Sequence, residues 1–218
     1  DMADNIVHLT LARIPDGPAG SKGISLFIVP KFLPNADGSL GARNAMASGS
    51  LEHKMGIRGS ATSVINYDGA KGFLLGEEHQ GLAGMFTMMN YERLSVGLQG
   101  LGAADLAYQL SASYARDRIQ GRSVSGPQNP DAAADSILVH PDVRRMLLTQ
   151  RAYAEGCRAF ALYVGLQLDE AKYNNNERAG RISEMLTPVV KAFLTDKGLD
   201  GAVMGQQVLG GHGFIKEW

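Results

Sequence analysis

The spacing of apolar positions changes once along the chain, near residue 81. Before that point, apolar residues come in short runs that are rich in β-branched and aromatic side chains. These runs predict strands at 6–12, 24–29, 62–67 and 72–75, with turns at 15–20 and 35–38. Short strands separated by glycine-containing turns indicate a small antiparallel β-barrel or sandwich.

From residue 81 on, apolar positions recur every three or four residues, which is the period of an amphipathic helix. A first helix carries its apolar stripe over 94–119, and a loop over 123–139 follows it. Pro141 suits the first position of a second helix, because the N–H that proline lacks has no partner there. The stripe of this second helix runs over 143–168.

A polar link at 174–176 precedes a third helix, which ends near Gly210. Pro188 either starts the main body of this helix or kinks it. Three long amphipathic helices form a bundle, which a further helix or another subunit would complete. The apolar positions of the third helix are Ile182, Met185, Val189, Ala192, Leu199 and Val203.

The two patterns together predict an α+β protein, with a β-domain over 1–80 and an all-α helical bundle over 81–218. Both ends look like cuts through a longer protein. The chain opens without an initiator methionine, a basic leader or a signal peptide, and it stops at Trp218 shortly after a glycine cluster. We therefore expect a fragment.

The amino-acid composition and net charge argue against several classes of protein. The 21 Lys+Arg residues against 22 Asp+Glu residues give a net charge of −1, which argues against a generic nucleic-acid binder. One cysteine excludes an internal disulfide, and five scattered histidines offer no zinc-ligand spacing. Because no apolar run approaches the length of a membrane-spanning helix, we also expect no membrane insertion. The 27 glycines stand out, at about 12% where roughly 7% is usual.

Two features of the predicted helices have structural explanations. Gly100-Leu101-Gly102 neither follows a strand nor opens a helix, so close helix packing explains it better than dinucleotide binding. Cys157 lies on the stripe of the second helix among alanines, which is typical of a small buried hydrophobe.

Two groups of arginines are candidates for binding an anion. Arg116 and Arg118 lie at the end of the first predicted helix, and Arg122 follows shortly after. These arginines either interact favourably with the negative end of the helix dipole or bind a phosphate. Arg144 and Arg145 lie in the first turn of the second helix, where cations oppose the dipole and thus hint at an acidic partner.

The densest signal is Gln207-Val208-Leu209-Gly210-Gly211-His212-Gly213-Phe214. Three glycines in four residues let a ligand or another chain approach the backbone closely, whereas a helix C-cap explains only one of them. His212 is either a turn residue or a catalytic one. The turn is favoured because no acidic or thiol partner stands beside it in the sequence.

Several motifs follow one another in order. They are H-K-M-G-I-R-G-S-A-T at 53–62, L-G-E-E-H-Q-G at 75–81, E-R-L at 92–94 with G-L-G-A-A at 100–104, Y-A-R-D-R at 114–118 with G-R at 121–122, and the glycine cluster at 207–214. Together they resemble the motifs of the acyl-CoA dehydrogenase family. The loop at 123–139 and the segments 29–32 and 140–147 resemble its methylmercaptopropionyl-CoA dehydrogenase-like subgroup. The Y-A-R-D-R stretch is one residue short and has Gln120 where phenylalanine is usual.

The resemblance implies a role for particular residues. Arg118 would contact the FAD pyrophosphate of a neighbouring subunit. The diphosphate–adenosine part of the flavin would be bound across the same interface by Gln207, Gly210 and Gly211. Asn90 and Arg93 fall at substrate-side positions. Residues 1–80 would be an N-terminally truncated middle β-domain, and 81–218 a C-terminally truncated helical domain.

The implied reaction is the α,β-dehydrogenation of an acyl-CoA thioester, with removal of the α-proton by a carboxylate and hydride transfer to flavin N5. The usual base is a glutamate downstream of the glycine cluster, beyond Trp218. A minority of the family places the base on the first helix, at the position of Glu92. We therefore expect the isolated chain to bind FAD weakly and to be inactive.

The resemblance also implies a homodimer or homotetramer, an electron-transfer acceptor, and a cytoplasmic location, or the mitochondrial matrix if the source is eukaryotic. Two alternatives stay open. One is a relative that acts as a nucleic-acid-associated flavoprotein, although the near-neutral charge speaks against it. The other is an acyl-CoA oxidase.

Overall fold

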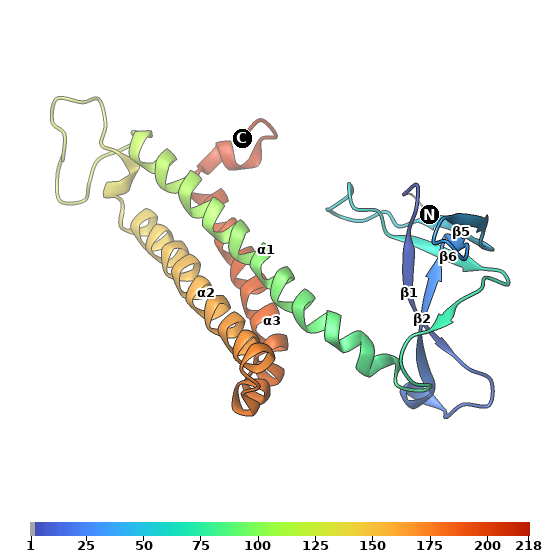
Figure 1. Ribbon diagram of the computed structural model, residues 1–218. Coiled ribbons are helices and arrows are strands. Elements are labelled where there is room, and N and C mark those ends of the chain that lie inside the picture. The colour runs from blue at the N-terminus through green and yellow to red at the C-terminus, as the bar shows by residue number, and fades with distance from the viewer. Residues whose placement is uncertain (1–2) are drawn as a thin grey trace. The chain divides into compact units, whose positions relative to one another are not determined.

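The computed structural model describes residues 3–218 and divides them into two compact units (Figure 1). The first unit ends at Met88 and is built mainly of strands. The second unit runs from Met89 to Trp218 and is helical. Helix α1 begins at Gly81, so its first two turns belong to the strand unit.

Antiparallel strands in the first unit form three small sheets. The largest has the order β1-β2-β7, and β1 pairs with β2 over its whole length, from Val7 opposite Pro30 to Arg13 opposite Ile24. The other two sheets are the pairs β3-β4 and β5-β6. The strands span β1 Val7–Arg13, β2 Ile24–Pro30, β3 Phe32–Pro34, β4 Leu40–Arg43, β5 Met46–Leu51, β6 Ser63–Tyr67 and β7 Phe73–Leu74.

The four predicted strands are confirmed as β1, β2, β6 and β7, whereas β3, β4 and β5 were not predicted. Strand β5 has the sequence Met-Ala-Ser-Gly-Ser-Leu, in which small residues with low strand propensity hide the signal. Strand β3 has three residues and ends in a proline. Among residues 3–218 the sheets do not close into a barrel.

The second unit is a bundle of three helices, α1 Gly81–Asp117, α2 Pro141–Tyr173 and α3 Glu177–Val208, and α1 enters it from the strand unit (Figure 1). Pro141 is the first residue of α2, as predicted. The polar link lies between α2 and α3, where the Asn176 side chain caps α3 by accepting from the Ala179 amide at 3.1 Å. Pro188 lies inside α3 and does not start it.

Glycines bring α1 and α3 into backbone contact. A Cβ on Gly198 would lie 2.6 Å from the Gly100 carbonyl oxygen, and a Cβ on Gly100 would collide with the backbone of Leu194. The predicted close packing is therefore confirmed at Gly100. It is wrong for Gly102, where an added Cβ would meet no neighbouring element within 4 Å.

The predicted stripes agree with the buried face for α2 and for most of α1, whereas none of the six apolar positions predicted for α3 is buried. The stripe of the first helix included Leu98, which is exposed in α1, and Ile119, which is exposed and lies beyond the end of α1. In α3, Met185 is 63% exposed and Leu199 is 67% exposed. The face that α3 buries combines small or hydroxyl-bearing residues with three larger apolar ones: Ala179, Ser183, Thr187, Val190, Leu194, Gly198, Gly201, Gly205 and Val208.

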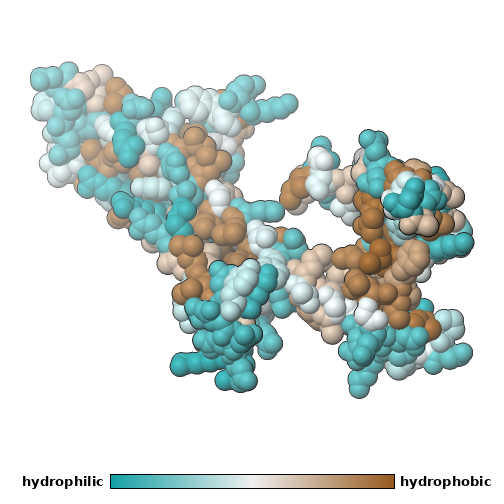
Figure 2. Space-filling view, viewed as in Figure 1, coloured by the Kyte–Doolittle hydropathy of each residue, from teal (hydrophilic) through white to brown (hydrophobic). Residues whose placement is uncertain are grey.

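The pattern misidentified this face because close packing against α1 requires small residues, which contribute little to an apolar stripe. The long apolar side chains of α3 lie on a different face, where Met185, Val189, Phe193, Leu199 and Val203 are exposed. Apolar surface is visible along the helical unit in Figure 2.

Candidate functional site

The end of α1 and the turn after α3 enclose a small hollow of about 190 Å³. Arg118 and Gln120 line it from the segment that follows α1. Gly210, Gly211 and His212 line it from the turn, together with Tyr114, Ile137, Val208 and Leu209. The structure thus brings together three of the four predicted cofactor residues, Arg118, Gly210 and Gly211, from segments about 90 residues apart.

Arg118 is held at this place by its main chain. Its N–H donates to the Tyr114 carbonyl at 2.9 Å and so extends α1 by one bond, while its carbonyl accepts from the Ile137 amide at 2.9 Å. These two bonds fix the position of the Arg118 backbone. The next residue, Ile119, pairs with Ser136 in an isolated antiparallel β-bridge. The Arg118 side chain remains exposed and available to a ligand.

The turn after α3 is a short 3-10 helix, η3 Gly210–Phe214. Gly210 has a φ of +59°, which explains why glycine is favoured at this position. Both Gly210 and Gly211 face open space, so a ligand can approach their backbone. Gly213 has a different role, because a Cβ there would collide with the backbone of Gln206, whose side-chain amide donates to the Gly213 carbonyl at 2.9 Å.

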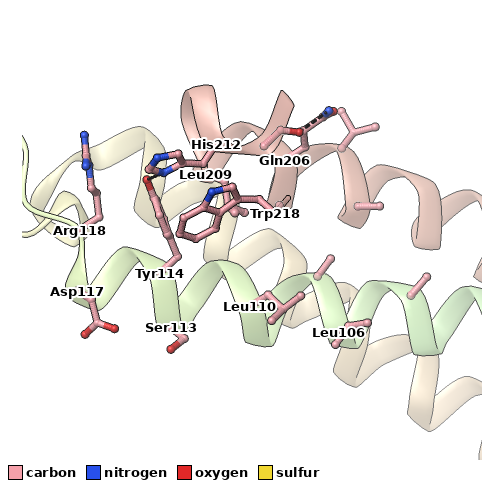
Figure 3. A pocket seen from close by; sticks show the side chains of 16 residues that line it. Leu106, Leu110, Ser113, Tyr114, Asp117, Arg118, Gln206, Leu209, His212 and Trp218 are labelled. Atoms are coloured by element: carbon pink, nitrogen blue, oxygen red, sulfur yellow. Dashed lines mark hydrogen bonds between the residues drawn. The ribbon is translucent and has the colours of Figure 1, made fainter. Parts of the chain in front are cut away.

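Aromatic contacts join the turn to α1. The Tyr114 hydroxyl lies 2.9 Å from Nδ1 of His212, and the His212 ring stacks on Trp218 with centroids 4.4 Å apart and planes 13° apart. The hydrogen bond, with the side chains of Arg118 and Gln206 nearby, is visible in Figure 3. His212 is therefore built into the turn, in agreement with its interpretation as a turn residue.

A larger groove of about 980 Å³ adjoins the hollow and shares Tyr114, Arg118, Leu209 and His212 with it. Figure 3 shows this groove between α1 and α3, with Leu106 and Leu110 along its α1 side. Most of its lining is apolar, so the arginine and the glycine turn mark its polar end.

Two predicted anion-binding residues lie elsewhere. Gln207 is exposed but lines neither the hollow nor the groove. Arg122 forms an ion pair with Asp135 at 3.4 Å and donates to the carbonyls of Asn129 and Ala132. Its guanidinium therefore organises the loop before α2, which leaves Arg118 as the arginine on the hollow.

Asp135 is a residue that sequence reasoning missed. Its carboxylate is 1% exposed and accepts from the backbone amides of Ser123, Gln128 and Asn129 at 2.8–3.0 Å. The amides of Ser123 and Asn129, with further help from Gln128 and the Arg122 cation, lower the pKa of Asp135 to about 2. No local motif marks this residue, because its partners lie 6 to 13 residues upstream in an irregular loop.

The predicted substrate-side residues lie together near the other end of α1. The Arg93 guanidinium donates to the Asn90 side-chain oxygen at 3.1 Å, and Glu92 is exposed on the next position of the helix. Arg93 and Arg118 are about 25 residues apart, which corresponds to roughly 37 Å of α-helix. The substrate-side and cofactor-side residues of this chain are therefore at separate places.

Other candidates have structural roles. Cys157 is 1% exposed, as predicted, and burial raises the pKa of its thiol. Arg145 pairs with Asp142 at 2.7 Å, and Arg144 donates to the Leu138 carbonyl at 2.6 Å, so both arginines that hinted at an acidic partner bind within the chain. Within residues 3–218 no group of three acidic, histidine or cysteine side chains could hold a metal ion. No helix in this part of the chain has the length and hydropathy needed to cross a membrane.

Comparison with known proteins gives relatives along the whole chain. The chain is 49% identical over its full length to 3-methylmercaptopropionyl-CoA dehydrogenase of Ruegeria pomeroyi and covers 37% of that protein. It is 38% identical to a butyryl-CoA dehydrogenase of Syntrophomonas wolfei, again over its full length and 37% of the relative. The chain thus spans little more than a third of the length of these curated relatives.

Solved structures share the fold. The structure of Caenorhabditis elegans ACDH-11 in complex with C11-CoA matches 97% of this chain and 34% of its own, with a TM-score of 0.79 and 23% sequence identity. The sequence profile described as "Acyl-CoA dehydrogenase, C-terminal domain" matches residues 79–218, which include α1, α2, α3 and the glycine turn. The chain belongs to the acyl-CoA dehydrogenase family.

Proposed function

We propose that this chain is part of an FAD-dependent acyl-CoA dehydrogenase, and that the small hollow holds the pyrophosphate of FAD bound mainly to a neighbouring subunit. The observation that carries the proposal is the convergence of Arg118 with Gly210 and Gly211 on one hollow. The relatives named as acyl-CoA dehydrogenases support the substrate class.

The residues on the hollow fit a pyrophosphate. A guanidinium matches phosphate oxygens in charge and in geometry, and glycine backbone without a Cβ allows close approach to N–H groups. Gly210 and Gly211 have the open space that such an approach needs. Gln207, which the family resemblance assigns to the same cofactor, would bind outside the hollow, because it is exposed next to the turn.

The chemistry divides between the cofactor and the protein. FAD, when bound, supplies the acceptor for the electrons that leave the acyl chain. The part of the protein described here positions that cofactor through Arg118 and the glycine turn. It also contributes Asn90 and Arg93, whose polar groups would orient the acyl-CoA thioester.

The base that removes the α-proton is proposed to lie outside these 218 residues, with Glu92 as the alternative within them. A general base of this kind works best where water is excluded. Glutamate is a common residue on a helix face, so the position of Glu92 on α1 does not by itself require a catalytic role, and we favour the glutamate outside this chain.

A homodimer or homotetramer follows from the same proposal, because the cofactor would be shared between subunits. The exposed apolar face of α3 supports further burial in the full-length assembly, since apolar patches of this kind mark interaction surfaces. The enzyme would pass its electrons to an electron-transfer protein, in the cytoplasm or, in a eukaryote, in the mitochondrial matrix.

The proposal is tested with the full-length protein, purified and made anaerobic. Titration with a panel of acyl-CoAs of increasing chain length should bleach the flavin absorbance near a stoichiometric ratio for at least one of them. Oxygen consumption should then be slow compared with the reduction of an artificial electron-acceptor dye. Fast oxygen consumption would instead indicate an oxidase, and salt-dependent DNA binding without flavin bleaching would indicate the nucleic-acid-associated alternative.

A further inference from the structure

The loop between α1 and α2 is organised around one buried carboxylate, that of Asp135. This residue lies 17 positions beyond Arg118, in the loop at 123–139, and the family resemblance assigns it no role. It nevertheless contacts both ends of the loop, through its side chain and through its main chain.

The side chain of Asp135 accepts hydrogen bonds from the first half of the loop. One carboxylate oxygen accepts from the amides of Gln128 at 3.0 Å and Asn129 at 2.8 Å, and the other accepts from the Ser123 amide at 3.0 Å. Arg122 closes the arrangement by pairing with the same carboxylate and by donating to the Asn129 carbonyl at 2.9 Å. Buried carboxylates with several N–H donors are strongly held in one orientation.

The main chain of Asp135 is bonded to the segment that carries Arg118. The Asp135 amide donates to the Gly121 carbonyl at 3.0 Å, and its carbonyl accepts from the Gln120 amide at 2.9 Å. The next residue but one, Ile137, donates to the Arg118 carbonyl at 2.9 Å. Side chain and main chain together therefore determine where the backbone of residues 118–121 lies.

This arrangement separates the roles of the two arginines. Arg122 points its guanidinium to Asp135 and the loop carbonyls, whereas Arg118 lines the hollow with its side chain exposed. We propose that Asp135, with Arg122 as its partner, is a positioning residue that holds Arg118 and Gln120 against the glycine turn for binding of the cofactor pyrophosphate. The proposal rests on the proposed function, because it concerns the same hollow.

Replacement of Asp135 by asparagine tests this with little change in size. One acceptor oxygen becomes an NH₂ group that must face backbone N–H donors, and the charge opposite Arg122 is lost. The loop would lose the side-chain bonds that support the 118–121 segment, whereas the main-chain bonds of this segment to residues 135 and 137 remain possible. The hollow keeps all its own side chains. The matched control is Asp131→Asn, which removes an exposed carboxylate of the same loop.

The experiment uses apoprotein of the full-length enzyme, titrated with FAD and followed by flavin fluorescence. Asp135→Asn should raise the dissociation constant for FAD about tenfold, by analogy with the loss of affinity when the partner of a metal-ligating residue is removed. Asp131→Asn should stay within about twofold of the wild type, because surface substitutions away from special features have small effects.

A double variant shows whether Asp135 acts through Arg118. If it does, Arg118→Gln combined with Asp135→Asn should weaken FAD binding no more than Arg118→Gln alone. Multiplied effects in the double variant would overturn the proposal, as would an unchanged dissociation constant for Asp135→Asn. If Asp135→Asn does not fold, Arg122→Gln is measured in the same way and decides by the same two criteria.

The controls separate this inference from the proposed function. A large effect of Arg118→Gln with none of Asp135→Asn would remove only the positioning role. No effect of Arg118→Gln would contradict the cofactor assignment of the hollow and the positioning role together.

Discussion

The hydroxyl of Tyr114 lies 2.9 Å from Nδ1 of His212 and joins the end of α1 to the glycine turn after α3. This bond crosses 98 positions of sequence and sits on the border between the small hollow and the larger groove. The bond therefore helps to hold Gly210 and Gly211 in position opposite Arg118.

Tyr114→Phe should loosen the glycine turn. The variant keeps the ring contacts but loses one partly buried hydrogen bond, which is worth about 0.5–1.5 kcal/mol. We expect the dissociation constant for FAD in the full-length protein to rise about two- to tenfold. Tyr163→Phe, which removes a hydroxyl from a half-exposed position of α2, is the control and should bind FAD like the wild type. Equal dissociation constants for wild type, Tyr114→Phe and Tyr163→Phe would show that the bond does not stabilise the glycine turn for FAD binding.

The glycine contact between α1 and α3 predicts opposite effects at two neighbouring positions. Gly100→Ala should destabilise the full-length protein by about 1–3 kcal/mol, because the added methyl group meets the backbone of Leu194. Gly102→Ala should be neutral or stabilising by up to about 1 kcal/mol, because it has open space and gains helix propensity. Chemical denaturation measures both values. A stable Gly100→Ala protein would contradict the packing.

Glu92→Gln tests the base within the chain. If the base lies elsewhere, turnover of the best acyl-CoA substrate should stay within about threefold of the wild type, since loss of a general base usually costs about 10²–10⁴ in rate. Stopped-flow reduction of the flavin gives the rate of the chemical step directly. A loss of a hundredfold or more, with the flavin still bound, would assign the base to Glu92.

The buried carboxylate of Asp135 predicts a pH dependence of stability. Its pKa is lowered to about 2 in the folded protein, from an ordinary value of 3.8, by the backbone amides that it accepts from. Its stabilising contribution is therefore complete above pH 3.8 and is lost as the pH falls through about 2. The difference in melting temperature between wild type and Asp135→Asn should be constant near neutral pH and should shrink with acid. A difference that grows on acidification would show that the carboxylate is not held as described.

Much of the fold follows from local patterns. The four apolar strands, the start of α2 at Pro141 and the polar link before α3 are confirmed because each depends on residues close together in the sequence. The buried face of α3 was misidentified because it depends on how close α1 approaches. Only three larger apolar residues lie on that face, and the glycines, serine and threonine between them give no apolar signal.

The residues of the candidate site also divide into those that motifs identify and those that only the folded structure reveals. Arg118, Gly210 and Gly211 could be identified from motifs, and the structure brings them to one hollow. Asp135 could not, because its importance comes from three amides and a guanidinium that the loop folds around it. Arg122 belongs to the same cationic cluster as Arg118 in the sequence, and the structure separates the two, because Arg122 pairs with Asp135 whereas Arg118 lines the hollow.

The central claim is that the hollow at Arg118 binds the pyrophosphate of FAD. It is tested most directly by the dissociation constant for FAD of the full-length apoprotein, compared for Arg118→Gln and for Arg116→Gln, an exposed arginine two residues away that does not line the hollow. Loss of a hydrogen bond to a charged group is worth about 1.5–3 kcal/mol, so Arg118→Gln should weaken binding by roughly 10- to 100-fold while Arg116→Gln changes it less than twofold. Equal affinities for the two variants would contradict the account.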